Sequence, residues 1–408
     1  MSATSASVPS RHPDAPRPVP MGIRLVAAAL RIGPSDQAQW DRIGADLTAG
    51  DPAMARLVDT MSGADGAEQK ELFETVARDG LARTSDVPVA MREFFTMAEN
   101  PPEWVDFARV RRGQRSLRRG GADGTYIARD VSFLGGYQFS SFNQTLLRTG
   151  VMKKGSNKRF AETLQWALDV TDDGGLEPGG VGYRSTLRVR MIHEFVRRYV
   201  SRRSDWQADD WGLPINQTDM AATLVGALIA PATGGLAMGV VLSPRELDDI
   251  AHTTRYVGWL MGVDDYWLPR SFRDGVRILH HTLGALSAPD ETTRQLVEPM
   301  AADPLDWHLP APTGLRRKVA RALHLSITAT YLGPRTMREL GLPTLVLPWY
   351  PAMRIPVNLA RSAAALFLPG GLERAGRRGR EEQLRFLEQM IGTSTAAIGD
   401  SATVAHAG

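Results

Sequence analysis

The residues best suited to chemistry are Arg190, His193 and Arg197, which recur at intervals of three and four on a helix expected from about Tyr183 to Val200. Side chains at this spacing are neighbours on one helix face. Apolar residues border that face: Val189, Ile192, Val196 and Val200. An imidazole in apolar surroundings can bind haem iron, and flanking guanidiniums can neutralise the haem propionates. The same pattern also fits a packed or solvated histidine on a wet, arginine-rich helix.

A second stripe of mixed chemistry precedes this face in the chain. Arg159, Glu162, Thr163 and Trp166 share one side of a helix that Ser156 or Asn157 can cap. The core-facing side of the same helix is indicated by apolar residues every four positions: Phe160, Leu164 and Leu168. A loop rich in Gly and Asp connects the two helices.

Together the two helices resemble the core of the latex-clearing protein (rubber oxygenase) family, whose domain also occurs in the oxygenase of mycophenolic acid biosynthesis. The matching pattern is Arg-x-x-x-Thr at Arg159 and Thr163. It is followed by Arg-x-x-His-x-x-x-Arg at Arg190, His193 and Arg197. Two further matching segments are PINQTD, residues 214–219, and HTTRYVGWLMGVDD, residues 252–265.

This resemblance implies an all-α fold, a single large helical domain with a globin-like core that binds haem b. It also implies that His193 is the proximal ligand of the iron, and so the metal-binding residue. Arg159 and Thr163 would face dioxygen on the distal side. Arg190 and Arg197 would either pair with the haem propionates or fix the proximal helix.

Two positions depart from the rubber oxygenases. Those enzymes carry a Lys immediately before the distal Thr, where this chain has Glu162. They also carry a Glu, proposed as a base, on the preceding helix. The position sixteen residues before Arg159 is Asn143, and an amide cannot take up a proton at neutral pH. Glu162 is therefore the nearby carboxylate that we nominate as proton acceptor, unless it forms a salt bridge with Lys158 or Arg159.

These features predict a haem b-dependent oxygenase that uses dioxygen to attack or cleave a C=C bond in a hydrophobic, isoprenoid-like substrate. Two alternatives stay open: another haem-dependent oxidation in secondary metabolism, and a non-catalytic globin-like haem protein that carries or senses oxygen. Rubber oxygenases that attack extracellular polymer are generally exported, but we recognise no secretory signal here. We therefore expect a cytoplasmic enzyme with a metabolite as its substrate rather than solid polyisoprene.

The composition narrows the other possibilities. The formal net charge is only +3, and the basic run at residues 109–120 contains no aromatic residue, so no nucleic-acid partner is indicated. The absence of cysteine excludes disulfides, thiolate-ligated haem, iron–sulfur clusters and cysteine-based zinc sites. The uncharged run Met220–Pro244 is long enough to cross a bilayer. Because Pro231 interrupts it, we expect a buried helix that ends near Ala230 rather than a membrane span.

The expected domain covers residues 36–393, between a disordered proline-rich leader at 1–35 and a disordered tail at 394–408. One long helix with many aromatic residues, over 122–149, is a candidate distal wall. The segment PWYPAMRIP, residues 348–356, is expected to be a surface connection. Further helices are expected over 271–287, 312–332, 355–368 and 372–391.

Overall fold

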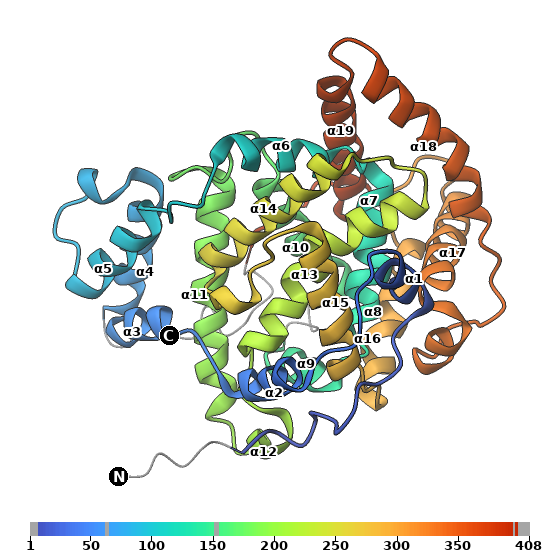
Figure 1. Ribbon diagram of the computed structural model, residues 1–408. Coiled ribbons are helices and arrows are strands. Elements are labelled where there is room, and N and C mark those ends of the chain that lie inside the picture. Colours follow the sequence, from blue (N-terminus) through green and yellow to red (C-terminus); the bar gives the residue numbers. More distant parts are fainter. Residues whose placement is uncertain (1–6, 62–64, 151–154, 395, 399–408) are drawn as a thin grey trace.

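The protein is an assembly of packed helices, seen here in a computed structural model (Figure 1). Within the residues that the structure describes, regular elements are helical, and one isolated bridge joins Phe139 to Ala288. The expected all-α fold is therefore confirmed. The described residues are 7–61, 65–150, 155–394 and 396–398.

The elements follow one another along the chain with short connections. The α-helices are α1 (Met21–Ala29), α2 (Gln37–Ala45), α3 (Pro52–Thr60), α4 (Gly66–Asp79), α5 (Val89–Glu99), α6 (Phe107–Arg118), α7 (Gly121–Ile127), α8 (Leu134–Gly136), α9 (Ser140–Arg148), α10 (Ser156–Val170), α11 (Val181–Ser201), α12 (Ala208–Trp211), α13 (Gln217–Ala237), α14 (Pro244–Met261), α15 (Phe272–Leu286), α16 (Glu291–Ala302), α17 (Thr313–Glu339), α18 (Trp349–Phe367) and α19 (Gly371–Ile391). A π-helix spans Ala128–Phe133, and short 3₁₀ helices span Asp46–Thr48, Leu81–Arg83, Asp265–Trp267 and Asp303–Leu305.

Helix α13 lies in the middle of the assembly and packs against α7, α14 and α15 (Figure 1). It is long and apolar enough to cross a bilayer, but 61% of its apolar window is buried inside the fold. Its expected end near Ala230 is wrong, because the helix continues through Pro231 to Ala237. Tertiary packing holds this last turn: the Tyr331 hydroxyl donates to the Gly234 carbonyl at 2.6 Å. A Cβ at Gly234 would lie 2.8 Å from the Ile127 side chain.

The buried apolar residues form two large clusters that meet at α10. The first joins α2 to α5 with α11 and α13 to α15, and the second joins α8 to α10 with α16, α17 and α19. Trp166 and Val170 of α10 belong to the first cluster, whereas Phe160 and Leu164 belong to the second. The polar stripe of α10 therefore lies at a seam between two well-packed regions.

The leader differs from expectation, because residues 7–35 are ordered on the surface of the helices. Arg11 forms an ion pair with Asp219 at 2.8 Å, and the Trp40 indole donates to the Pro13 carbonyl at 3.1 Å. These contacts are made with residues distant in sequence, which composition cannot reveal. Residues 1–6 of the leader, and residues 395 and 399–408 of the tail, lie outside the described residues.

Two further expectations about helices are wrong. The segment 122–149 is not one helix, because it is divided into α7, the π-helix, α8 and α9. Buried polar contacts hold the π-helix in place: Arg129 donates to the Met300 carbonyl at 2.5 Å, and Asp130 contacts His324 Nδ1 at 2.5 Å. The expected surface connection at 348–356 instead forms the start of α18.

Candidate functional site

Helices α10 and α11 form an antiparallel pair whose register can be followed along the chain. A Cβ at Gly182 would lie 2.6 Å from the Asp169 carbonyl oxygen, so the two helices touch near their connection. Further along, the Trp166 indole donates to Thr186 Oγ1 at 3.1 Å. Seven residues before Trp166 is Arg159, and seven residues after Thr186 is His193. Because both steps are about two helical turns, this register brings Arg159 and His193 to the same level.

His193 has the burial and protonation expected of a histidine that can bind a metal ion. The residue is half-buried, and its ring lies deep enough in the protein for burial to govern its protonation. Its Nδ1 atom is buried and has no hydrogen-bond partner among the described residues. Burial lowers the pKa of His193 to about 3, and the charges of Arg197 and Arg159 act in the same direction. The imidazole is therefore neutral at physiological pH and can donate a lone pair to a metal.

The distal pair expected on α10 is assembled. Arg159 Nη1 donates to Thr163 Oγ1 at 2.8 Å, and both side chains are half-buried. The guanidinium also lies 5.6 Å from the centre of the Phe133 ring, at cation–π distance. Glu162, beside them in sequence, is buried with 4% of its surface exposed.

Tyr137 adds a polar group that the sequence interpretation treated only as one of several aromatic residues. Its ring packs edge-on against Phe133 at 5.7 Å, and its hydroxyl is buried without a partner among the described residues. Burial raises the pKa of Tyr137, and the Arg159 charge opposes that shift. Tyr137 thus stays protonated near Arg159 and offers a hydrogen-bond donor.

The guanidinium of Arg190 is bound to groups from two other parts of the chain. It forms a bidentate ion pair with Asp51 at 2.6 and 2.9 Å, and it donates to the Leu260 carbonyl at 3.1 Å. Burial alone would raise the pKa of Asp51, but the charge and hydrogen bonds of Arg190 outweigh burial and hold that pKa below its ordinary value. No pattern in the sequence connects Asp51 to Arg190, which is 139 residues away.

Arg197 is also held by protein groups. It contacts Glu194 on its own helix and donates to the Ile215 carbonyl at 2.7 Å, which ties α11 to the segment before α13. The contacts of Arg190 and Arg197 tie α11 to other parts of the chain, which is one of the two roles expected for these arginines. Pairing of either residue with a haem propionate stays a prediction.

Two other residues that the sequence brought into consideration have structural contacts. The Asn143 amide is fully buried and donates to the Tyr137 carbonyl at 2.8 Å and to Thr292 Oγ1 at 3.1 Å. His252 Nε2 accepts a hydrogen bond from the Asp106 backbone at 3.0 Å, and burial lowers the pKa of His252 to about 4. His252 therefore joins α14 to the start of α6 as a neutral, bonded residue.

The expected side-chain cap of α10 is wrong, because Gly155 occupies the N-cap position and no side chain of the described residues caps it. The start of the helix is fixed instead by a carboxyl group from the end of α16. Ser156 Oγ donates to Asp303 at 2.8 Å, and Arg129 approaches the other oxygen of Asp303 at 3.3 Å. Burial raises the pKa of Asp303 to about 6, although the Arg129 charge opposes the shift. Ser156 and Asp303 are 147 residues apart, and nothing in the sequence points to their contact.

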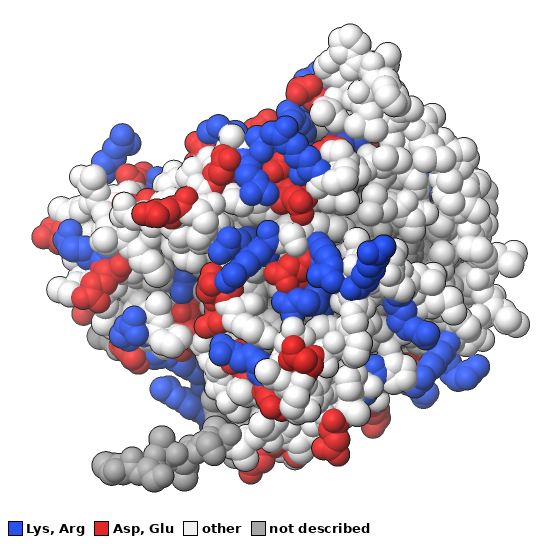
Figure 2. All heavy atoms as spheres, in the orientation of Figure 1, with Lys and Arg blue, Asp and Glu red and all other residues white. Residues whose placement is uncertain are grey.

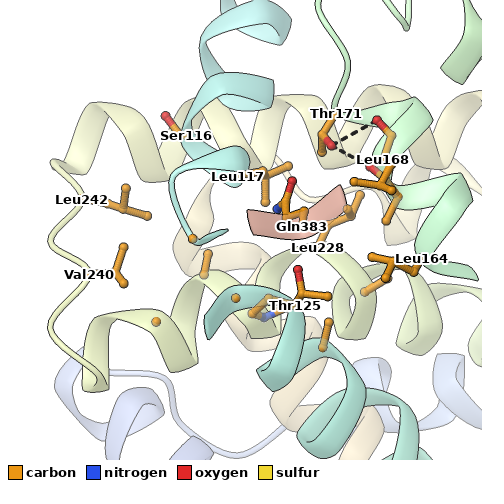
Figure 3. A pocket seen from close by; sticks show the side chains of 18 residues that line it. Ser116, Leu117, Thr125, Leu164, Leu168, Thr171, Leu228, Val240, Leu242 and Gln383 are labelled. Atoms are coloured by element: carbon orange, nitrogen blue, oxygen red, sulfur yellow. Dashed lines mark hydrogen bonds between the residues drawn. The ribbon is translucent and has the colours of Figure 1, made fainter. Parts of the chain in front are cut away.

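A cavity of about 70 Å³ lies on the other side of α10, lined by Leu164 and Leu168 with Leu228 and Gln383 (Figure 3). Figure 3 shows mainly apolar side chains around it, and Thr171 bonds back to Leu168. An engineered cavity of about 150 Å³ accommodates benzene, so this one is too small for an extended isoprenoid. It also adjoins the apolar stripe of α10 rather than the stripe of Arg159, so we do not assign the substrate to it.

The residues present fit a haem better than other metal sites. Haem iron needs one protein nitrogen on the proximal side, because the porphyrin supplies four ligands. The neutral, unpaired imidazole of His193 meets that need on a helix fixed by Arg190 and Arg197. Within the part of the chain that the structure describes, no three His, Asp or Glu side chains cluster to hold a metal ion.

Comparisons with known proteins identify the family and the fold. Residues 125–367 match the family model described as "ER-bound oxygenase mpaB/B'/Rubber oxygenase, catalytic domain". The chain is 21% identical over 249 residues to the rubber oxygenase of Streptomyces sp. (strain K30), which covers 60% of this chain and 58% of that protein. The match therefore spans a little over half of that relative.

Among solved structures, the fold is similar to that of latex clearing protein LCP in the closed state, with a TM-score of 0.62. The likeness covers 82% of this chain and 88% of that protein at 20% sequence identity. At this identity the similarity establishes the fold.

Proposed function

The chain belongs to the family of mpaB-type and rubber oxygenase catalytic domains, and from this we propose that it is a haem b-dependent oxygenase. The proposed reaction uses dioxygen to attack or cleave a C=C bond in a hydrophobic, isoprenoid-like substrate. One observation carries the proposal: the buried, neutral His193 lacks a hydrogen-bond partner at Nδ1 among the described residues and lies at the level of Arg159 across the α10–α11 pair.

In this proposal each residue has a distinct task. His193 would hold the iron, and haem, when bound, would supply the redox-active centre that dioxygen chemistry requires. Arg159 donates hydrogen bonds toward dioxygen and stabilises negative charge that develops there. Thr163 orients Arg159 through the hydrogen bond between them. Arg190 and Arg197 keep α11 rigid, so the imidazole cannot turn away.

Glu162 remains our nominated proton acceptor, because Asn143 cannot take that role. Tyr137 is a neutral donor near Arg159, so it can orient oxygen atoms but not accept a proton at neutral pH. A Glu162→Gln enzyme should turn over more slowly with unchanged haem content. Unchanged turnover would remove Glu162 from the mechanism.

The substrate class and the location are also proposals. The relative is named a rubber oxygenase, which supports a hydrophobic alkene, and we propose a metabolite of that class in the cytoplasm. Fractionation of producing cells checks the location. A different haem-dependent oxidation stays the second candidate, because Glu162 and Asn143 replace a Lys and a Glu of the rubber oxygenases. A non-catalytic oxygen carrier or sensor is the third.

The decisive experiment is an absorption spectrum of the purified protein reconstituted with hemin. We expect a Soret band in the wild type and in a His308→Ala control, whose histidine is exposed, and its loss in His193→Ala. Oxygen uptake with isoprenoid alkenes then separates an oxygenase from a carrier, and the masses of the products separate cleavage from other oxidations. A colourless wild type that does not take up hemin would refute the proposal.

A further inference from the structure

Helix α18 is amphipathic in the reverse of the usual sense, because its polar side chains face the protein. Tyr350, Arg354 and Asn358 all donate to the buried carboxylate of Asp123, at 2.7, 2.8 and 2.7 Å. Ser362, one turn further on, accepts from the Val241 backbone at 2.9 Å. These contacts fasten α18 to α7 and to the end of α13 through its polar face.

The outer face of α18 is apolar throughout. Its only two charged residues, Arg354 and Arg361, are paired with Asp123 and Glu382. Figure 2 shows an uncharged surface over α18, whereas charged side chains gather over α19 and the helices beyond it. The outward side chains, with their exposed fractions, are Met353 56%, Ile355 38%, Val357 40%, Leu359 47%, Leu366 41% and Phe367 83%.

The apolar surface extends beyond the helix at both ends. Leu345 and Leu347, in the segment that leads into α18, are 98% and 76% exposed, and Leu368 after it is 54% exposed. A helix on the surface of a water-soluble protein normally turns its apolar stripe inward. Contiguous apolar surface of this kind marks a site of interaction. The outer face of α18 is therefore a candidate for contact with another apolar surface.

Basic residues border this face. Arg374, Arg377 and Arg378 are exposed in the first turns of α19, which packs against α18. The acidic residue among them, Glu373, is paired with Arg115 at 2.8 Å.

Further basic residues are exposed at the start of α17, a helix that meets α18 near Ser326. Arg316 and Lys318 are exposed there beside Leu315, which is 63% exposed. Apolar side chains flanked by cations are the combination that binds the interface of an anionic membrane. A two-fold copy of the chain would instead bring an equally basic border toward this one, which disfavours self-association.

We propose that the outer face of α18, together with residues 345–347 and 368, docks on the surface of an anionic phospholipid bilayer. The helix lies in the interface with its apolar side chains at the boundary between headgroups and acyl chains, and the arginines of α19 contact lipid phosphates. This peripheral binding does not depend on the proposed oxygenase activity.

The test is flotation of the full chain with phosphatidylcholine vesicles, with and without phosphatidylglycerol. We expect retention on the vesicles that contain phosphatidylglycerol, and weaker retention at high salt. Leu359→Asp and Phe367→Asp should each lower the partition coefficient more than tenfold, because each removes a large apolar contact and inserts a charge. Arg377→Gln and Arg378→Gln should each lower it about fivefold.

The matched control is Val89→Asp on α5, where the side chain is 73% exposed but distant in sequence from α18. It should float like the wild type, and the unfolding midpoints of all variants should agree because every altered side chain is exposed. Equal retention on vesicles without phosphatidylglycerol, or equal loss in Val89→Asp, would overturn the proposal. So would a monomer that floats with neither vesicle, or a non-floating dimer that Phe367→Asp dissociates.

Discussion

Helices α10 and α11 face each other across the candidate site but are fixed in opposite ways. Helix α11 is held by Asp51, whose pKa is lowered by its ion pair with Arg190. Helix α10 is held by Asp303, whose pKa burial raises to about 6. A lowered pKa means that the fold stabilises the charged form of the carboxylate. A raised pKa means that the fold stabilises the neutral, protonated form.

The arginines of the two helices differ in the same way. Arg190 and Arg197 bind groups from other parts of the chain. The described contacts of Arg159 stay with Thr163 on its own helix and with Phe133. We infer that α11 is built as a rigid support for His193, while Arg159 on α10 keeps hydrogen-bonding capacity for a ligand.

The largest effect on the difference between the two helices is expected from a change at Arg190. Arg190→Met should lower the free energy of unfolding by about 3–5 kcal/mol, because it leaves the Asp51 charge buried without its partner. Urea denaturation measures this loss. The control is Arg188→Met on the same helix, where the ion pair with Glu74 is partly exposed and its removal should cost at most about 1 kcal/mol. Equal losses of unfolding free energy in the two variants would contradict the idea that the buried ion pair of Arg190 holds α11 more strongly than the exposed pair of Arg188.

On α10 the corresponding change should affect chemistry rather than stability. Arg159→Leu should lower turnover by about 10²–10³-fold, as when a donor to a developing oxyanion is removed. Haem content and the free energy of unfolding should stay close to wild type. The stretching frequency of carbon monoxide added to the reduced protein should also shift, because it reports the polarity beside the iron. A variant that loses haem instead would make Arg159 part of the scaffold.

The two carboxyl groups predict opposite dependences of stability on pH. Below about pH 6 the folded protein keeps the Asp303 proton, while the unfolded chain loses it near pH 4. The free energy of unfolding should therefore fall by roughly 2–3 kcal/mol between pH 4 and 6 and then level off. The contribution of Asp51 has the other sign, since it is present above about pH 4 and is lost as pH falls through its lowered pKa.

Asp303→Asn isolates this slope. Urea denaturation from pH 4 to 7 measures the unfolding free energy of wild type and variant. The wild-type value minus the variant value should decrease between pH 4 and 6. A difference independent of pH would mean that Asp303 titrates normally in the folded protein.

The smallest expected effect is at Thr163. Thr163→Val removes the acceptor that orients Arg159, so turnover should fall by up to about tenfold, in line with roughly 0.5–1.5 kcal/mol for one hydrogen bond. Thr163→Ser keeps the hydroxyl and should retain the wild-type rate. If both variants are equally slow, the methyl group rather than the hydroxyl matters at this position.

The local patterns of the chain predicted several features correctly. The apolar spacing placed α11 within two residues of its observed ends, and the pairs at three- and four-residue intervals put Arg159 beside Thr163. These features follow from hydrogen bonds and side-chain contacts within one or two helical turns, which neighbouring residues alone decide.

Contacts between distant residues required the tertiary structure. The partners Asp51 and Arg190 are 139 residues apart, and the proline-rich leader is ordered by groups such as Asp219 far along the chain. The reversed orientation of α18 depends on Asp123, because a helix with two opposite faces does not specify which one is buried. Sequence periodicity therefore determined local helices such as α11, and the family resemblance singled out His193 as the candidate ligand. Long-range burial and pairing of charges decided which side chains are fixed and which remain available.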